Sequence, residues 1–116
     1  MHPIFLMIFA LTAFSTVAAA ATKPIRFWNL TTKTVTSLEL AKAGTSNFGA
    51  DLCKGDKDGS VDYDERLNLS SVVPGSYDVK VGYASGRTCI VKNLNLQQGK
   101  VFSIEDKDLT ACTKPN

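Results

Sequence analysis

Apolar and polar residues alternate in short segments from residue 25 onward, which is the pattern of half-buried β-strands. The strictest alternation covers residues 77–83, where Val79 and Val81 fall on one face with a tyrosine at either end. Asp78 and Lys80 fall on the opposite face. A strand with one face in the core and the other in water alternates in this way. We therefore predict a strand over 77–83 with both valines buried.

Other segments carry the same signal, with β-branched or aromatic residues between glycine-containing turns. The predicted strands cover residues 25–30, 34–40, 66–70, 88–91 (continued to Leu96 through a bulge at Asn93) and 100–104. Residues 34–40 also admit a helix over 37–43, because Leu, Glu, Ala and Lys favour helices. Pro74-Gly75 predicts a type II turn. About seven short strands with regular turn signals predict an all-β fold, an antiparallel β-sandwich.

The long segment over residues 43–65 lacks a strand pattern and holds an acidic stretch. A loop of this length in a small domain is usually functional or disordered. With Gly59 at the sixth position of an EF-hand calcium loop, oxygen donors fall at the third, fifth, seventh, ninth and twelfth positions. These donors are Asp56, Asp58, the Ser60 carbonyl, Asp62 and Glu65. The spacing predicts a calcium site formed by these five residues.

The acidic stretch departs from an EF-hand in two ways. Lys54 occupies the first position, where a carboxylate ligand belongs, so Asp51 or water would have to supply that ligand. No helix is predicted on either side of the loop. The alternative interpretation is a solvated acidic turn, with Asp58-Gly59 reversing the chain. Calcium, if bound, is expected to be bound weakly, and no other cofactor is expected.

The chain begins with an apolar run over residues 4–14, which is too short to span a bilayer comfortably. Four alanines at 18–21 follow and fit the small-residue rule for signal-peptide cleavage. We predict a signal peptide over 1–21, cut near Ala20 or Ala21, and a single domain over 22–116. The expected location is the periplasm or the outside of the cell, without a stable membrane anchor after cleavage. An uncleaved anchor is the alternative.

Composition narrows the possible functions. The one histidine, His2, leaves with the signal peptide, so the mature chain cannot form a Ser-His-Asp or Cys-His centre or a zinc site containing His. A hydrolase using Asp62, Asp64 or Glu65 would need carboxylates that face each other across a cleft. These three lie on one loop, so we expect no enzymatic activity. The net charge of +2 is spread without a basic block, so no nucleic acid is expected as a partner.

The chain has three cysteines, Cys53, Cys89 and Cys112, and an exported protein can form a disulfide. One bridge and one free thiol are expected. Spacing does not decide the pairing. We favour Cys89–Cys112, which would tie the C-terminal tail to a strand.

Residues 73–81 read V-P-G-S-Y-D-V-K-V. This segment resembles the P-G-x-Y-x-V hairpin of prealbumin-like and carboxypeptidase-regulatory-like β-sandwich domains, and the mature chain resembles small secreted bacterial β-proteins of unknown function. The resemblance implies an Ig-like or prealbumin-like sandwich with a non-catalytic accessory, cell-surface or carbohydrate-related role. The sequence therefore predicts a secreted, non-catalytic domain with a weak calcium loop. The alternative is a binding or inhibitory module that uses Trp28 and the long loop to hold a protein or a glycan.

Overall fold

The computed structural model describes residues 10–13 and 22–114. The expected cleavage near Ala20 or Ala21 lies outside the described residues. The described part contains six strands and two short 3₁₀ helices. Their bounds are β1 Ile25–Leu30, β2 Val35–Lys42, η1 Leu52–Gly55, β3 Arg66–Leu69, β4 Gly75–Tyr83, β5 Thr88–Leu96, β6 Val101–Glu105 and η2 Asp106–Asp108. Neither of these helices has the length and apolar character needed to cross a membrane.

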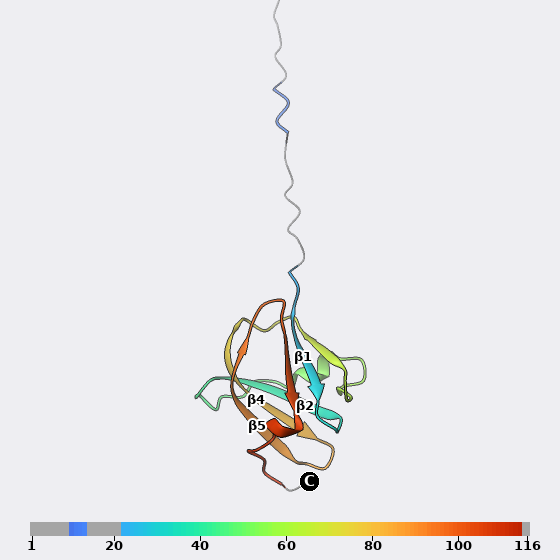
Figure 1. Ribbon diagram of the computed structural model, residues 1–116. Coiled ribbons are helices and arrows are strands. Elements are labelled where there is room, and N and C mark those ends of the chain that lie inside the picture. The colour runs from blue at the N-terminus through green and yellow to red at the C-terminus, as the bar shows by residue number, and fades with distance from the viewer. Residues whose placement is uncertain (1–9, 14–21, 115–116) are drawn as a thin grey trace, which may run out of the picture.

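The strands form two three-stranded sheets, with the orders β3-β1-β6 and β2-β4-β5 (Figure 1). The predicted all-β fold is confirmed, although six strands are described where about seven were expected. One strand pair also differs from an antiparallel sandwich, because β1 and β6 run parallel, with Phe27 opposite Phe102. These strands are far apart in the chain. No hairpin joins them, so nothing requires them to be antiparallel.

The inner faces of both sheets contribute to one hydrophobic core. Its members include Ile25, Phe27, Leu67, Leu69, Phe102 and Ile104 from one sheet and Val35, Leu38, Val79, Val81, Cys89 and Leu96 from the other. The rings of Phe27 and Phe102 lie 5.5 Å apart between their centroids. Burial of these side chains is the main favourable term in a fold of this size. The arrangement is sandwich-like.

The local predictions have mixed outcomes. Residues 35–42 form strand β2 and not a helix, because pairing with β4 buries Leu38 between the sheets. The bulge at Asn93 is confirmed by its φ of 61° and by a shift in the pairing of β4 with β5.

The prediction of a type II turn at Pro74-Gly75 is wrong. Gly75 lacks a positive φ and begins β4, and the chain turns earlier, where the Val72 N–H donates to the Leu69 carbonyl at 3.2 Å.

Strand β4 confirms the predicted alternation except at one residue. Val79 and Val81 are both 0% exposed. Asp78, expected to be in water, is only 7% exposed. Its carboxylate accepts hydrogen bonds from the backbone N–H groups of Asn93 at 2.9 Å and Gly44 at 3.1 Å. Asp78 therefore joins β4 to the bulge of β5 and to the turn that follows β2.

The expected Cys89–Cys112 disulfide is present, and Cys53 is a buried free thiol. The tail also pairs with the edge of β5, because the Ile90 N–H donates to the Ala111 carbonyl and the Thr113 N–H donates to the Thr88 carbonyl, each at 2.9 Å. A free strand edge is a site for unwanted pairing. The disulfide therefore holds the tail over part of this edge.

Candidate functional site

Trp28 lies on the outer face of the β3-β1-β6 sheet and is held from two sides. Its indole N–H donates to the Asp64 carboxylate at 2.9 Å. The Arg66 guanidinium lies over the ring, 4.1 Å from the ring centroid, in a cation–π contact. Trp28 and Arg66 are directly paired across β1 and β3, and the indole stays half-buried. The ring is therefore fixed in place but still accessible.

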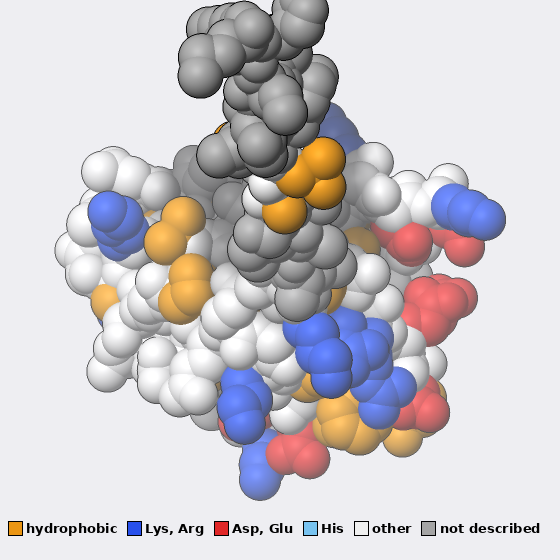
Figure 2. All heavy atoms as spheres, turned by 90° about the horizontal axis from the view of Figure 1, so that it is seen from above, with side chains coloured by type: hydrophobic (Ala, Val, Ile, Leu, Met, Phe, Trp, Pro, Cys, Tyr) orange, Lys and Arg blue, Asp and Glu red, His pale blue; other side chains and the backbone are white. Residues whose placement is uncertain are grey.

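The side chains around Trp28 form an open polar surface. Positions on β1, β3 and β6 that alternate with the core residues point away from the core. We call them the Trp28 face, and they comprise Arg26, Trp28, Arg66, Asn68, Val101 and Ser103. In Figure 2, several Lys or Arg side chains gather on one side of the domain beside apolar side chains, with Asp or Glu side chains at their margin. Trp and Arg are enriched among the residues that contribute most of the binding energy at protein interfaces.

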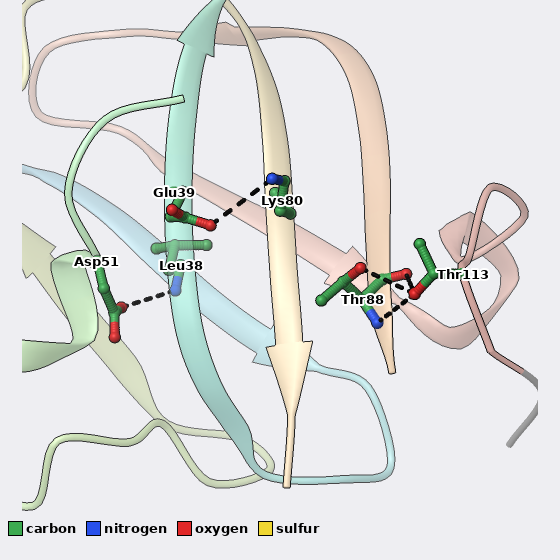
Figure 3. A network of polar contacts seen from close by, with 6 residues as sticks. All are labelled: Leu38, Glu39, Asp51, Lys80, Thr88 and Thr113. Atoms are coloured by element: carbon green, nitrogen blue, oxygen red, sulfur yellow. Dashed lines mark hydrogen bonds and ion pairs between the residues drawn. The ribbon is translucent and has the colours of Figure 1, made fainter. Parts of the chain in front are cut away.

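On the outer face of the β2-β4-β5 sheet, Lys80 makes contacts with other side chains of the protein. Lys80 forms an ion pair with Glu39, with 3.9 Å between Nζ and Oε2 (Figure 3). The Nζ atom of Lys80 also lies 4.2 Å from the ring centroid of Phe48, which belongs to the long loop. The loop therefore folds against this face.

The long loop also covers the free edge of β2. The Leu38 N–H donates to the Asp51 carboxylate at 2.9 Å (Figure 3). The Gly49 N–H donates to the Leu40 carbonyl at 3.0 Å, and Val35 exchanges two backbone hydrogen bonds with Val61 at 2.9 and 2.8 Å. These contacts satisfy strand groups that would otherwise be left open. Much of the segment that the sequence marked as a candidate site is thus part of the sheet's edge.

The backbone of the acidic stretch follows the EF-hand spacing at two positions. Gly59, at the sixth position, has a φ of 69°, in the left-handed region that favours glycine. Its N–H donates to the Asp56 carbonyl at 3.2 Å, which closes a turn. Val61, at the eighth position, is 1% exposed and anchors the stretch to the core.

The side chains of two of the predicted calcium ligands, Asp62 and Glu65, accept hydrogen bonds. Asp62 accepts a hydrogen bond from the Thr34 hydroxyl at 2.8 Å, and Glu65 accepts one from the Asp62 backbone N–H at 2.8 Å. Asp62 and Glu65 are brought together. Over residues 10–13 and 22–114, however, no three Asp, Glu, Cys or His side chains are grouped as metal ligands. Asp51, considered as a substitute ligand, instead accepts from Leu38 and from the Cys53 N–H at the start of η1.

Asn29 connects the acidic stretch to β1, a role that sequence reasoning missed. It is 0% exposed, and its amide nitrogen donates to the carbonyls of Val61 at 2.8 Å and Lys33 at 3.0 Å. Its amide oxygen accepts from the N–H and hydroxyl of Thr31 at 3.0 and 2.6 Å. Its backbone exchanges hydrogen bonds with Asp64 and Glu65 at 2.7 and 3.0 Å. The only sequence signal here was Asn29-Leu30-Thr31, which reads as a glycosylation pattern.

Two buried titratable groups belong to the core. Burial, followed by the negative charge of Asp51, raises the pKa of the Cys53 thiol to about 12. A thiol that stays protonated is a poor nucleophile. Burial also raises the pKa of Tyr83, whose hydroxyl donates to Thr31 at 3.1 Å.

A groove of about 570 Å³ is lined by residues 42–43 and 73–77, close to the start of β4. Val73, at its rim, is 70% exposed. The Tyr77 hydroxyl donates to the Val73 carbonyl across it. Its lining carries a single charged side chain, that of Lys42, so it offers no pair of acid–base groups.

Comparison of the chain with protein-family models, with curated proteins and with solved structures found no match in any of the three. The resemblance of residues 73–81 to a prealbumin-like hairpin remains an expectation.

Proposed function

We propose that this protein is a non-catalytic domain of the periplasm or the extracellular space that binds a glycan on the Trp28 face. The observation that carries the proposal is the fixed position of Trp28 between Asp64 and Arg66. An aromatic ring offers an apolar surface to a sugar ring, and a ring that is already immobilised loses little freedom on binding. Arg66, Asn68 and Ser103 lie beside it and supply hydrogen-bond partners for sugar hydroxyls.

Three observations support a non-catalytic role in an oxidising compartment. A disulfide is typical of exported proteins. The carboxylate of Asp62 accepts a hydrogen bond from Thr34, and that of Glu65 accepts one from the Asp62 backbone N–H, so both already make structural contacts. Asp64 is held by the indole of Trp28. The carboxylates that a hydrolase would need therefore have structural partners.

The single tryptophan of the chain provides a direct test, because its fluorescence reports on this face alone. Oligosaccharides retained on a glycan array should quench or shift Trp28 emission when titrated into the protein. Trp28→Ala should weaken retention at least tenfold, a loss of about 1.4 kcal/mol in binding free energy. Val73→Ala, in the groove and outside the Trp28 face, is the matched control and should bind as the wild type does. Unchanged retention by Trp28→Ala would refute the proposal.

A second proposed function is weak calcium uptake by the acidic stretch. The left-handed Gly59 and the anchored Val61 favour it, since both match the EF-hand spacing. Binding through Asp56, Asp58, the Ser60 carbonyl, Asp62 and Glu65 would require Asp62 to release Thr34 and Glu65 to release the Asp62 N–H. The affinity expected is about 10⁻⁴–10⁻³ M, as in extracellular modules.

Calcium titration followed by thermal melting tests this second function. At ten times the dissociation constant, calcium should add about 1.4 kcal/mol to the free energy of unfolding. Asp58→Ala should abolish the rise in melting temperature, and Lys54→Asp should enlarge it by restoring the first ligand. A melting curve that millimolar calcium leaves unchanged in all three proteins would exclude the site.

A further inference from the structure

We infer that the glycan bound on the Trp28 face is acidic, and that Lys23, Arg26 and Lys100 hold its anionic groups. The inference rests on the proposed function, because it names the ligand class of that same site.

The backbones of three cationic residues, Lys23, Arg26 and Lys100, lie close together at one end of the Trp28 face. Arg26 lies two residues before Trp28 on β1 and points to the same side. Its backbone N–H donates to the Lys100 carbonyl at 3.1 Å, which brings the turn before β6 against the start of β1. The Gln98 side-chain amide donates to the Lys23 carbonyl, and Lys23 lies against Gly99. All three cationic side chains are exposed.

These cations are available to a ligand. The ion pairs found among the described residues are Lys80–Glu39 and Lys107–Glu105, and neither involves Lys23, Arg26, Lys100 or Arg66. Exposed cations without a carboxylate partner can form charge-assisted hydrogen bonds with an incoming anion. Arginine also binds a carboxylate or sulfate with two parallel hydrogen bonds.

The charges along the face are polarised. Val101 lies opposite Arg26 and Glu105 lies opposite Leu30, so the acidic end is separated from the cations by four residues of β6, about 13 Å. Asp64 lies near that acidic end as well, since its N–H donates to the Asn29 carbonyl. A chain of sugars crossing the ring of Trp28 would meet cations on one side of the indole.

The same separation of positive and negative side chains argues against an anionic lipid membrane as the ligand. A membrane of anionic lipids would contact the whole face at once, so Asp64 would be pressed against negative head groups and repelled, whereas Glu105 is already paired with Lys107. A glycan chain of a few residues can contact the cationic end and the Trp28 ring alone. The charge distribution therefore favours a glycan as the ligand. Binding to lipid vesicles is measured as the alternative.

The test uses the mature protein on an array that carries neutral, uronate-containing and sulfated oligosaccharides side by side. The uronate set includes a hexagalacturonate and its methyl ester, which share a backbone and differ in charge. The wild type should prefer the acid over the ester at least tenfold at about 20 mM salt, and the preference should shrink at about 300 mM salt because ions screen exposed charges. Arg26→Gln with Lys100→Gln should remove the preference but retain binding of the ester. Lys42→Gln with Lys92→Gln, on the other sheet, makes the same charge change and should behave as the wild type.

The remaining outcomes separate the two claims. Equal retention of acid and ester, dependent on Trp28, would overturn the acidic ligand and leave the proposed function intact. Retention of no glycan, together with binding to phosphatidylglycerol vesicles, would identify a lipid-binding face and overturn both claims. Retention of no glycan and no vesicle would also overturn both.

Discussion

Trp28 and Asp64 are 36 residues apart in the chain, and the indole N–H of Trp28 donates to the Asp64 carboxylate at 2.9 Å. This bond links the two regions with candidate chemistry, because Asp64 belongs to the acidic stretch and Trp28 belongs to the open face. Asp64 is itself fixed by its backbone bond to Asn29. The acidic stretch therefore orients the aromatic ring, whether or not it binds calcium.

The first prediction concerns this bond. Asp64 has a φ of 68°, a conformation that glycine and asparagine tolerate. Asp64→Gly should keep the fold and free the indole, so acrylamide should quench Trp28 emission more strongly than in the wild type. Asp64→Asn keeps an acceptor oxygen and should quench as the wild type does. Equal quenching in all three proteins would mean that the bond does not hold the ring.

The second prediction concerns Asn29. Asn29→Ala would leave the buried N–H of Thr31 without its acceptor, at a cost of about 1–3 kcal/mol, and would remove one of the two donors to the Val61 carbonyl, which keeps the Val35 N–H. Urea unfolding should show a large loss of stability. Asn68→Ala is the matched control, since Asn68 is an exposed asparagine on the neighbouring strand and should change stability by less than about 0.5 kcal/mol. Similar losses in the two variants would contradict this role of Asn29.

The third prediction is a pH dependence. The backbone N–H of Asn93, followed by that of Gly44, lowers the pKa of Asp78 below its ordinary value of 3.8. A carboxyl group with a lowered pKa in the folded state contributes stability that is complete above the unfolded value and is lost as pH falls through the folded value. The urea midpoint of the wild type should therefore drop as pH falls below about 4. Asp78→Asn should be less stable at pH 7, and the stability difference from the wild type should narrow toward pH 2. A constant difference would assign the acid sensitivity to other groups.

The fourth prediction separates the cysteines. The Cys89–Cys112 bridge spans a separation of 23 residues, for which chain entropy gives about 3 kcal/mol of stabilisation. Cys89→Ser with Cys112→Ser should lose roughly that amount. Cys53 should react with a thiol reagent only after unfolding, because it is buried and its raised pKa keeps it protonated. Fast labelling of the native protein would contradict its place in the core.

The sequence was most informative where a residue's environment follows from its own strand. The alternation around Val79 and Val81 was enough to predict β4 and its buried face, and the positive φ of Asn93 lies where the pattern suggested a bulge. Partners from distant segments could not be predicted in this way. Asp78 reads as a solvent-facing residue until the Gly44 turn and the Asn93 bulge bring their N–H groups to it.

The candidate sites show the same limit. The spacing of Asp62 and Glu65 matches a calcium loop, but spacing does not reveal that the Thr34 hydroxyl and a backbone N–H already occupy these carboxylates. Trp28 was noticed in the sequence, whereas its contacts with Asp64 and Arg66 depend on the pairing of β1 with β3. Pairing between strands far apart in the chain is a property of the whole fold.

Backbone and indole amide resonances can show residue by residue whether the Trp28 face binds the ligand. Addition of an array-selected oligosaccharide to the isotope-labelled mature protein should shift the indole N–H of Trp28 and the amides of Arg26, Arg66 and Ser103. Amides around Val73 and Tyr77, in the groove lined by residues 42–43 and 73–77, should stay in place. Shifts concentrated at Val73 and Tyr77, with the Trp28 indole unmoved, would show that the ligand binds in the groove and not on the Trp28 face.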